Sequence, residues 1–154
     1  MKKKQEIKKI IGRKDKVDFP KMRLYDVDAK IDTGAFTSAI HCHNIKITEK
    51  DGQKYVSFYL LDPTHPDYNE KRFRVPLHAK KRIKNSFGKS EERCIIKTLI
   101  TLFGEKFEIE LSLSDRSKME YPVLLGRKLL KKGFVVDVSK SNLSYKQKLK
   151  RSKK

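Results

Sequence analysis

The chain has 154 residues, of which 37% are hydrophobic and 37% are charged, with 7 Gly and 5 Pro. This length and composition suffice for one domain with a core, and they exclude collagen-like proteins and flexible Gly/Ser linkers. The net charge of +19 suggests an anionic partner, but residues 1–16 and 140–154 supply most of it, with +6 and +7.

The distribution of charge divides the chain into a basic tail over residues 1–9, a domain over 10–143 and a second basic tail over 144–154. Blocks of like charge usually stay solvated and attract polyanions without sequence preference. The tails therefore predict either a solubilising role or a weak contact with RNA or the ribosome.

No apolar run approaches the ~20 residues that cross a bilayer, and no apolar stretch follows the first lysines as in a secretory signal. We therefore expect a cytoplasmic protein with no membrane partner. Cys42 and Cys94 are too few for a disulfide framework, so both are expected to be free thiols in a reducing compartment.

Short apolar segments with a period of two, which is typical of strands, dominate the chain. In chain order the expected strands are 25–31, 38–47, 55–61, 72–77, 93–103, 106–113 and 134–138. The expected turns and loops are a hairpin turn at Asp51-Gly52, a turn at Gly104-Glu105 and an irregular loop over 62–71. A single short helix is expected over 127–132, ended by Gly133. Many short strands with one small helix predict an all-β barrel.

Asp32-Thr33-Gly34 follows the apolar strand 25–31 directly. A carboxylate at the end of a buried strand is held rigidly, Thr33 can bond to the local backbone, and Gly34 permits a tight turn and a close approach. A turn carboxylate that caps its own backbone is the alternative interpretation. One carboxylate cannot be acid and base at once, so a catalytic Asp32 would need its counterpart from a second chain, with the two sharing one proton.

A second motif, Leu124-Leu125-Gly126-Arg127, lies far downstream. Taken in order, the two motifs resemble the retropepsins, in which an apolar-apolar-Gly segment leads into a short helix and packs beside the catalytic loop. The chain is most similar to the bacterial retropepsin-like family that carries the name ATP-dependent zinc protease. Its members are often encoded near ATP-grasp ligases that add glutamate to proteins. The matching segments are 11–13, 30–41, 84–88, 92–93 and 109–127.

The resemblance implies a closed β-barrel of the acid-protease type, a homodimer, and hydrolysis of peptide or isopeptide bonds. It makes Asp32, Thr33 and Gly34 the catalytic candidates. It also implies a substrate among glutamate-modified protein tails, on which some members act.

Three arginines near the motifs, Arg93, Arg116 and Arg127, suit an acidic substrate because guanidinium groups bind carboxylates in a bidentate manner. With Ala35 they are the candidate substrate-binding residues. For Arg116 and Arg127 an ion pair at the dimer interface is the structural alternative.

The basic segment 80–88 ends in a turn and is either a solvated hairpin or a flap over the substrate. The flap candidates are Asn85, Ser86, Phe87 and Gly88. Thr37 and Ser38 are candidates for orienting the catalytic carboxylates from behind.

The word zinc in the family name finds little support in the residues. His41 and His43 share one face of an expected strand, but two imidazoles need a third ligand, and most such pairs are ordinary polar residues. We expect no metal site and no cofactor, with His41 and His43 as weak candidates.

Three functions remain open. The first is a dimeric aspartic-type peptidase with Asp32 from each chain. The second is a non-catalytic module that binds an acidic protein or rRNA through the barrel and the basic tails. The third is a zinc hydrolase, which would hold about one zinc per chain.

Overall fold

The computed structural model describes residues 8–61, 70–84, 88–115 and 120–152. Arg116 and the flap candidates Asn85, Ser86 and Phe87 lie outside the described residues. The strands are β1 (Lys9–Ile11), β2 (Lys14–Phe19), β3 (Leu24–Ile31), β4 (Ser38–Lys50), β5 (Gln53–Leu60), β6 (Arg72–Pro76), β7 (Ala79–Lys84), β8 (Ser90–Leu102), β9 (Glu105–Ser114), β10 (Val123–Leu125) and β11 (Phe134–Val136). The helices are the 3₁₀ turn η1 (Pro20–Met22), α1 (Arg127–Leu130) and α2 (Leu143–Ser152).

Six strands close into a ring of hydrogen bonds, in the order β2–β3–β10–β4–β9–β8 and back to β2. The short strand β10 is one of these six strands, and it pairs in parallel with β3 on one side and antiparallel with β4 on the other. The expected all-β fold with a closed, acid-protease-like sheet and a short helix after the second motif is therefore confirmed.

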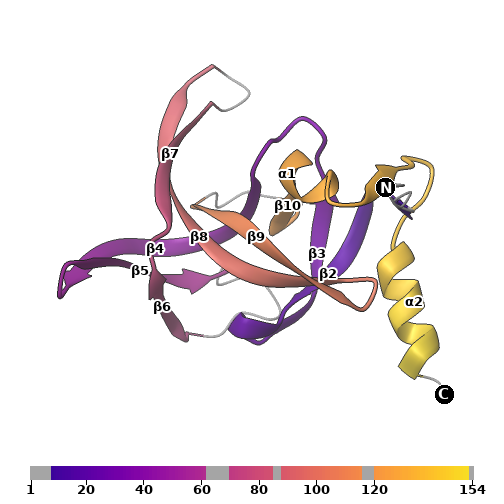
Figure 1. The fold of residues 1–154 in the computed structure, drawn as a ribbon, viewed down its shortest axis with the longest axis horizontal. Coiled ribbons are helices and arrows are strands. Elements are labelled where there is room, and N and C mark those ends of the chain that lie inside the picture. Colours follow the sequence, from indigo (N-terminus) through magenta and orange to yellow (C-terminus); the bar gives the residue numbers. More distant parts are fainter. Residues whose placement is uncertain (1–7, 62–69, 85–87, 116–119, 153–154) are drawn as a thin grey trace, which may run out of the picture.

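Two long arms leave the ring (Figure 1). The β4–β5 hairpin extends to one side and carries β6 on its outer edge, while β7 rises along the end of β8. The hairpin turns at Asp51-Gly52 as expected, because both residues adopt the positive φ angles (53° and 78°) that a two-residue turn requires.

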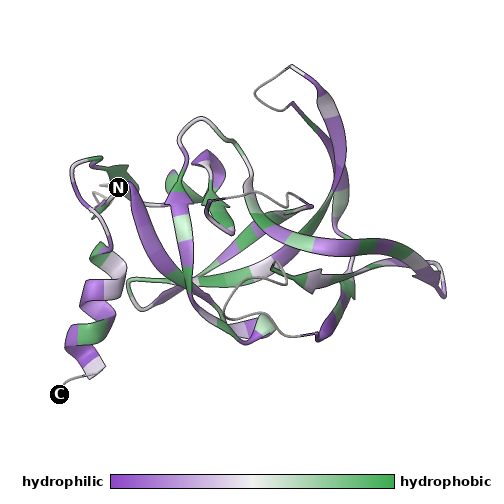
Figure 2. Cartoon of the chain, turned by 180° about the vertical axis from the view of Figure 1, so that it is seen from behind, coloured by the Kyte–Doolittle hydropathy of each residue, from purple (hydrophilic) through white to green (hydrophobic). Residues whose placement is uncertain are grey.

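The core follows from alternation along the strands. Figure 2 shows hydrophobic and hydrophilic residues following one another along most of them. In β2, every second residue points inward, so that Val17 and Phe19 are buried while their charged neighbours are not. The inward side chains of the ring strands meet in one hydrophobic cluster.

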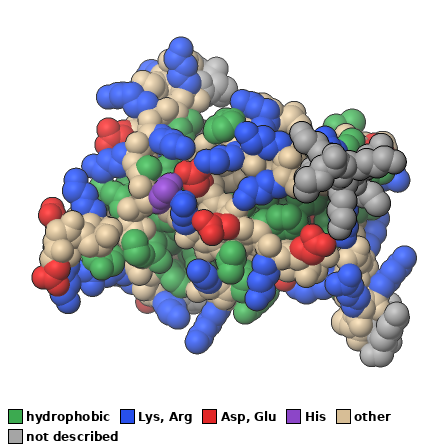
Figure 3. Space-filling view, viewed as in Figure 1, with side chains coloured by type: hydrophobic (Ala, Val, Ile, Leu, Met, Phe, Trp, Pro, Cys, Tyr) green, Lys and Arg blue, Asp and Glu red, His purple; other side chains and the backbone are tan. Residues whose placement is uncertain are grey.

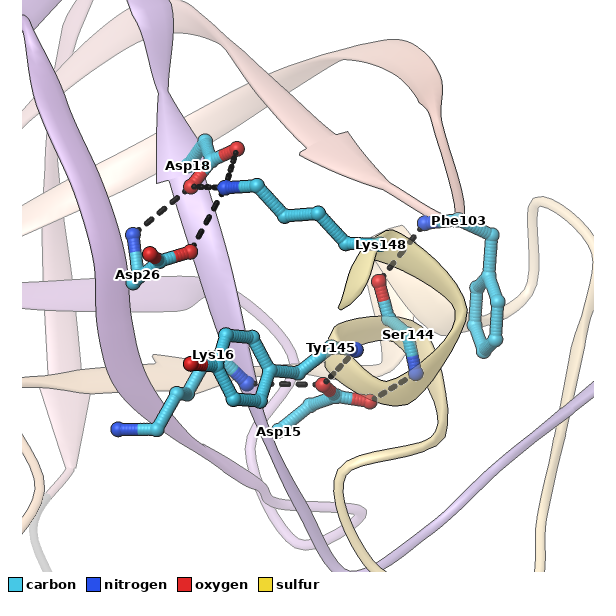
Figure 4. A network of polar contacts seen from close by, with 8 residues as sticks. All are labelled: Asp15, Lys16, Asp18, Asp26, Phe103, Ser144, Tyr145 and Lys148. Atoms are coloured by element: carbon cyan, nitrogen blue, oxygen red, sulfur yellow. Dashed lines mark hydrogen bonds and ion pairs between the residues drawn. The ribbon is translucent and has the colours of Figure 1, made fainter. Parts of the chain in front are cut away.

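One position breaks this alternation, since Asp15 occupies an inward position of β2 and is 1% exposed. Its carboxylate accepts hydrogen bonds from the backbone N–H groups of Ser144 (2.9 Å) and Tyr145 (3.0 Å), in the first turn of α2. Burial raises the pKa of Asp15, and the backbone donors oppose this rise. A residue 129 positions away therefore satisfies the N-terminal donors of α2 (Figure 4).

Two further contacts hold α2 against the ring. The Ser144 hydroxyl accepts a hydrogen bond from the Phe103 N–H (2.8 Å), and Lys148 bridges the carboxylates of Asp18 and Asp26 (2.9 and 2.7 Å; Figure 4). Most of α2 lies within residues 144–154, for which the sequence predicts a basic tail and no helix. No helix in the described part of the chain has the length and apolar character to cross a membrane.

We predict that Asp15→Ala lowers the free energy of unfolding by about 1–3 kcal/mol, because it leaves buried backbone donors without their acceptor. Chemical denaturation monitored by circular dichroism measures the change. Asp28→Ala is the matched control, since Asp28 is an exposed carboxylate on β3 that pairs only with Lys16 among the contacts described. An equal effect of both substitutions would mean that Asp15 does not anchor α2.

Candidate active site

Asp32 directly follows β3, and backbone groups bind both its N–H and its carboxylate. Its N–H donates to the Leu125 carbonyl (2.9 Å) at the end of β10, and its Oδ1 accepts from the Gly34 N–H (3.0 Å) two residues later. The turn is closed by the Ala35 N–H, which donates to the Asp32 carbonyl (3.2 Å). The carboxylate is half-buried and is therefore both oriented and accessible.

The second motif packs onto this turn, as the order of the motifs predicts. The N–H groups of Arg127 and Lys128 donate to the carbonyls of Ala35 (2.8 Å) and Phe36 (3.0 Å). A side chain at Gly126 would lie 2.8–2.9 Å from those two carbonyl oxygens, which is closer than a Cβ atom can approach. Gly126 therefore lets the two backbones meet.

Ser38 supports the same junction from inside. It is buried at the start of β4, and its hydroxyl accepts a hydrogen bond from the Gly126 N–H (3.1 Å). The expected role of Ser38 was to orient the carboxylate from behind; its contact in the structure is instead to the downstream motif. This bond joins residues 88 positions apart.

The Asp32 turn opens into a cleft of about 730 Å³. The cleft lies between the turn, α1 and the β7 arm, and Asp32 is the only carboxylate among the described residues that line it. The cationic side chains of its lining are Lys81, Arg82, Lys84, Arg93 and Arg127. Figure 3 shows that Lys and Arg are abundant on the face of the molecule in view as well.

Two of the predicted substrate-binding arginines, Arg93 and Arg127, line this cleft, and they differ in their contacts. Arg93 lies on β8 with a side chain only 5% exposed, and its Nη2 is 3.7 Å from the Glu91 carboxylate. Arg127 donates from Nη1 to the Thr33 carbonyl (2.9 Å) and lies over the Phe36 ring at 5.8 Å. Arg127 therefore braces the Asp32 turn in addition to lining the cleft.

The remaining candidates are distributed around the same place. Gly34 and Ala35 line the cleft, whereas Thr33 is exposed and presents its carbonyl to Arg127. Gly88, the one flap candidate within the described residues, is exposed between β7 and β8.

A charged cluster that sequence analysis did not identify connects the β7 arm to α1. Glu110 on β9 has a side chain 10% exposed and contacts His78 (2.9 Å), Lys81 (3.7 Å) and Lys128. His78 precedes β7 and Lys128 follows Arg127, so one carboxylate connects both walls of the cleft. The only signal of this cluster in the sequence is the position of Glu110, an acid that alternates with the apolar Ile109 and Leu111.

The histidine pair does not form a metal centre with other described residues, among which no group of three His, Cys, Asp or Glu side chains could hold an ion. His43 Nδ1 lies 3.0 Å from the Leu61 carbonyl, and its ring stacks on Tyr59. Burial raises the pKa of the Cys42 thiol between the two histidines to about 12, which keeps it protonated.

Residues 10–147 match the family described as "Retropepsin-like aspartic endopeptidase RimB". The chain belongs to this family. The resemblance noted from the two motifs is thereby confirmed at the level of the family and its fold.

Curated relatives of this family member carry another kind of name. The chain is 38% identical over 84% of its length to a "Probable alpha-L-glutamate ligase" of Desulfotalea psychrophila, and 37% identical over 86% to a protein of the same name from Shewanella pealeana. It spans less than a third of the length of these relatives, 28% and 29%.

A solved structure shares the architecture. The crystal structure of the protein Lpg0085 from Legionella pneumophila, a protein of unknown function, has a TM-score of 0.70 and 25% sequence identity. The similarity covers 88% of this chain and 98% of that one.

We predict that Gly126→Ala lowers the free energy of unfolding by about 1–3 kcal/mol, because the added methyl group forces the two motifs apart. Gly52→Ala is the control, since the hairpin tip has open space around Gly52 and any cost there arises only from its positive φ. Thermal and chemical denaturation of the two variants compare these effects. An unchanged Gly126→Ala protein would show that the junction is loose.

Proposed function

We propose that the protein is an aspartic-type peptidase that works as a homodimer, with one Asp32 from each chain. The observation that carries this proposal is the junction of the Asp32 turn with the downstream motif, at the edge of a large cleft in which no other described lining residue is a carboxylate. Aspartic-type hydrolysis uses two carboxylates, and a two-fold axis beside the turn would supply the second.

The chemistry follows from placing two identical acids about 3 Å apart. Like charges at that distance cannot both ionise, so the pair holds one proton. The ionised member takes a proton from a water molecule that attacks the scissile carbonyl, while the protonated member donates to the carbonyl oxygen. The tetrahedral adduct then returns that proton and breaks its C–N bond, and the acid that took the proton from water gives it to the leaving nitrogen. The hydrogen bond from Gly34 N–H to Asp32 Oδ1 fixes the orientation of the carboxylate within the turn.

The charge of the cleft supports an acidic peptide or protein as substrate. Among the described residues that line the cleft, five are Lys or Arg and Asp32 is the one carboxylate, so a chain rich in carboxylates would be attracted and a basic chain repelled. Relatives named glutamate ligase support the finer proposal that the substrate is a glutamate-rich protein tail, bound through Arg93 and Lys81.

We predict that Asp32→Asn reduces hydrolysis of a glutamate-rich peptide by at least about a hundredfold while leaving the fold and the dimer intact, because the amide cannot exchange the shared proton. Chromatographic assay of the cleaved peptide measures the rate, and sedimentation velocity measures the assembly. The matched control is Asp51→Asn, an exposed carboxylate at the hairpin tip whose φ of 53° suits asparagine. Undiminished turnover by the Asp32 variant, or an active monomer, would refute the proposal.

The alternative function, a non-catalytic module for an acidic protein or rRNA, rests on the net charge of +19. Deleting residues 144–154 would not test it cleanly, because Ser144 and Lys148 hold α2 on the ring. Replacing the exposed Lys146 and Lys150 by Gln removes charge and keeps the helix. Salt-sensitive binding that survives Asp32→Asn, together with the absence of hydrolysis in the wild-type protein, would favour the module.

A further inference from the structure

The outer face of the β4–β5–β6 sheet differs from the rest of the surface in its chemistry. Along β5, Val56, Phe58 and Leu60 face the core, so Tyr55 and Tyr59 face the other way. The strand register places side chains of β4 and β6 beside these two in rows. The rows are Lys50 with Gln53, Thr48 with Tyr55 and Pro76, Lys46 with Ser57 and Arg74, and His43 with Tyr59 and Arg72.

These rows interleave aromatic rings with cations. The described strand residues of the rows include two tyrosines, a histidine, two lysines and two arginines, and no Asp or Glu. Lys46, Lys50, Arg72 and Arg74 are exposed, and the tyrosine rings are partly exposed. The side chains of this set are also separate from the described residues that line the Asp32 cleft.

Specific contacts hold the aromatic rings and the cations in place. The guanidinium of Arg74 lies 4.5 Å from the centre of the Tyr55 ring. The rings of His43 and Tyr59 stack with their centres 5.5 Å apart and an angle of 18° between their planes. Arg72 donates to the Ser57 hydroxyl (2.6 Å), which directs its guanidinium toward the row of Lys46, Ser57 and Arg74. Ordering before binding lowers the entropy lost on association.

We propose that this face binds a single strand of nucleic acid. Aromatic side chains on an open sheet stack with bases whatever their identity, and neighbouring Arg and Lys side chains contact the phosphates. Tyr55 and Tyr59 are four residues apart, about 13 Å along the strand, so each can serve a different base. The four exposed cations meet no acidic residue in the rows, which makes the face complementary to a polyanion.

The aromatic rings distinguish this ligand from an acidic protein. A carboxylate-rich peptide requires cations but gains little from tyrosines, and the Asp32 cleft already offers cations without this ladder of rings. A strand of nucleic acid uses both components. The proposal concerns a surface separate from the proposed peptidase site and does not depend on the catalytic role of Asp32.

The decisive experiment changes the rings without changing the charge. The full chain carrying Tyr55→Leu and Tyr59→Leu is titrated against a fluorescent single-stranded RNA of about 12 nucleotides, followed by anisotropy at several salt concentrations. We expect affinity to fall by about tenfold or more while the slope against salt stays the same, because stacking is lost and phosphate contacts remain. Tyr25→Leu is the matched control, an exposed tyrosine on β3 outside the face, and it should bind as the wild type does.

A second pair of variants tests the charges. Arg72→Gln with Arg74→Gln should reduce the salt slope by about 1.4, roughly 0.7 for each phosphate contact with a single strand. The control pair is Lys21→Gln with Lys106→Gln, two exposed lysines elsewhere. If the control pair reduces the slope as much, the RNA spreads over the whole basic surface and the proposal is wrong.

Two alternative ligands, duplex RNA and an oligoglutamate peptide, are titrated in the same way. Thermal unfolding verifies that each variant is folded. Binding of duplex RNA should be unaffected by the tyrosine changes, because paired bases offer no open faces. If the tyrosine variant binds single strands with the affinity of the wild type, the face is not a nucleic-acid site. The same conclusion follows if its affinity for a fluorescent oligoglutamate peptide falls by the same factor as its affinity for RNA. The variant Asp32→Asn should leave RNA binding unchanged even if the peptidase proposal fails.

Discussion

The structure of the site depends on one junction, where the downstream Gly126 segment meets the turn after β3. Asp32 is hydrogen-bonded to Leu125, and the carbonyls of Ala35 and Phe36 receive the first N–H groups of α1. These bonds form only because Gly126 has no side chain to separate the backbones. Strand β10 can then enter the ring between β3 and β4, so the same contacts that orient the candidate catalytic acid also close the sheet.

The strong positive charge is organised by a few well-placed carboxylates. Glu110 gathers His78, Lys81 and Lys128 between the walls of the cleft, and Asp18 with Asp26 receives Lys148 of the last helix. The cationic partners in these pairs are partly exposed, so each pair contributes little to stability individually. Their effect is to hold cationic segments where like charges would otherwise drive them apart, which leaves the cleft and the outer β4–β5–β6 face as regions of excess positive charge.

Membership of the retropepsin-like family and similarity to proteins named glutamate ligase fit together in the proposed function. The chain corresponds to less than a third of those relatives, so the shared part is a unit that also occurs within longer proteins. A glutamate-rich protein tail is the proposed substrate that connects the two names. The cationic cleft is the feature of this chain that supports such a substrate.

The sequence by itself determined the elements whose signal is local. Alternating apolar residues predicted β3, β4, β5, β8 and β9, the Asp51-Gly52 pair predicted the hairpin turn, and the two ordered motifs predicted the family. Strand β2 was missed because Lys14-Asp15-Lys16-Val17-Asp18-Phe19 has only two apolar residues among charges. Helix α2 was missed because four of its ten residues are cationic, which is typical of a solvated tail, and because its N-terminal acceptor, Asp15, lies at the other end of the chain.

Only the tertiary structure decided which distant residues meet. The contact of Ser38 with Gly126 and the bracing of Thr33 by Arg127 join segments about 90 positions apart, and the ring order was likewise set by the tertiary structure. Glu110 also gathers cations around the cleft from two separate segments, since β9, β7 and α1 become neighbours only through the sheet. A local pattern specifies how a segment turns and which face it buries, whereas such contacts depend on how the closed sheet brings segments together, and no local pattern encodes that.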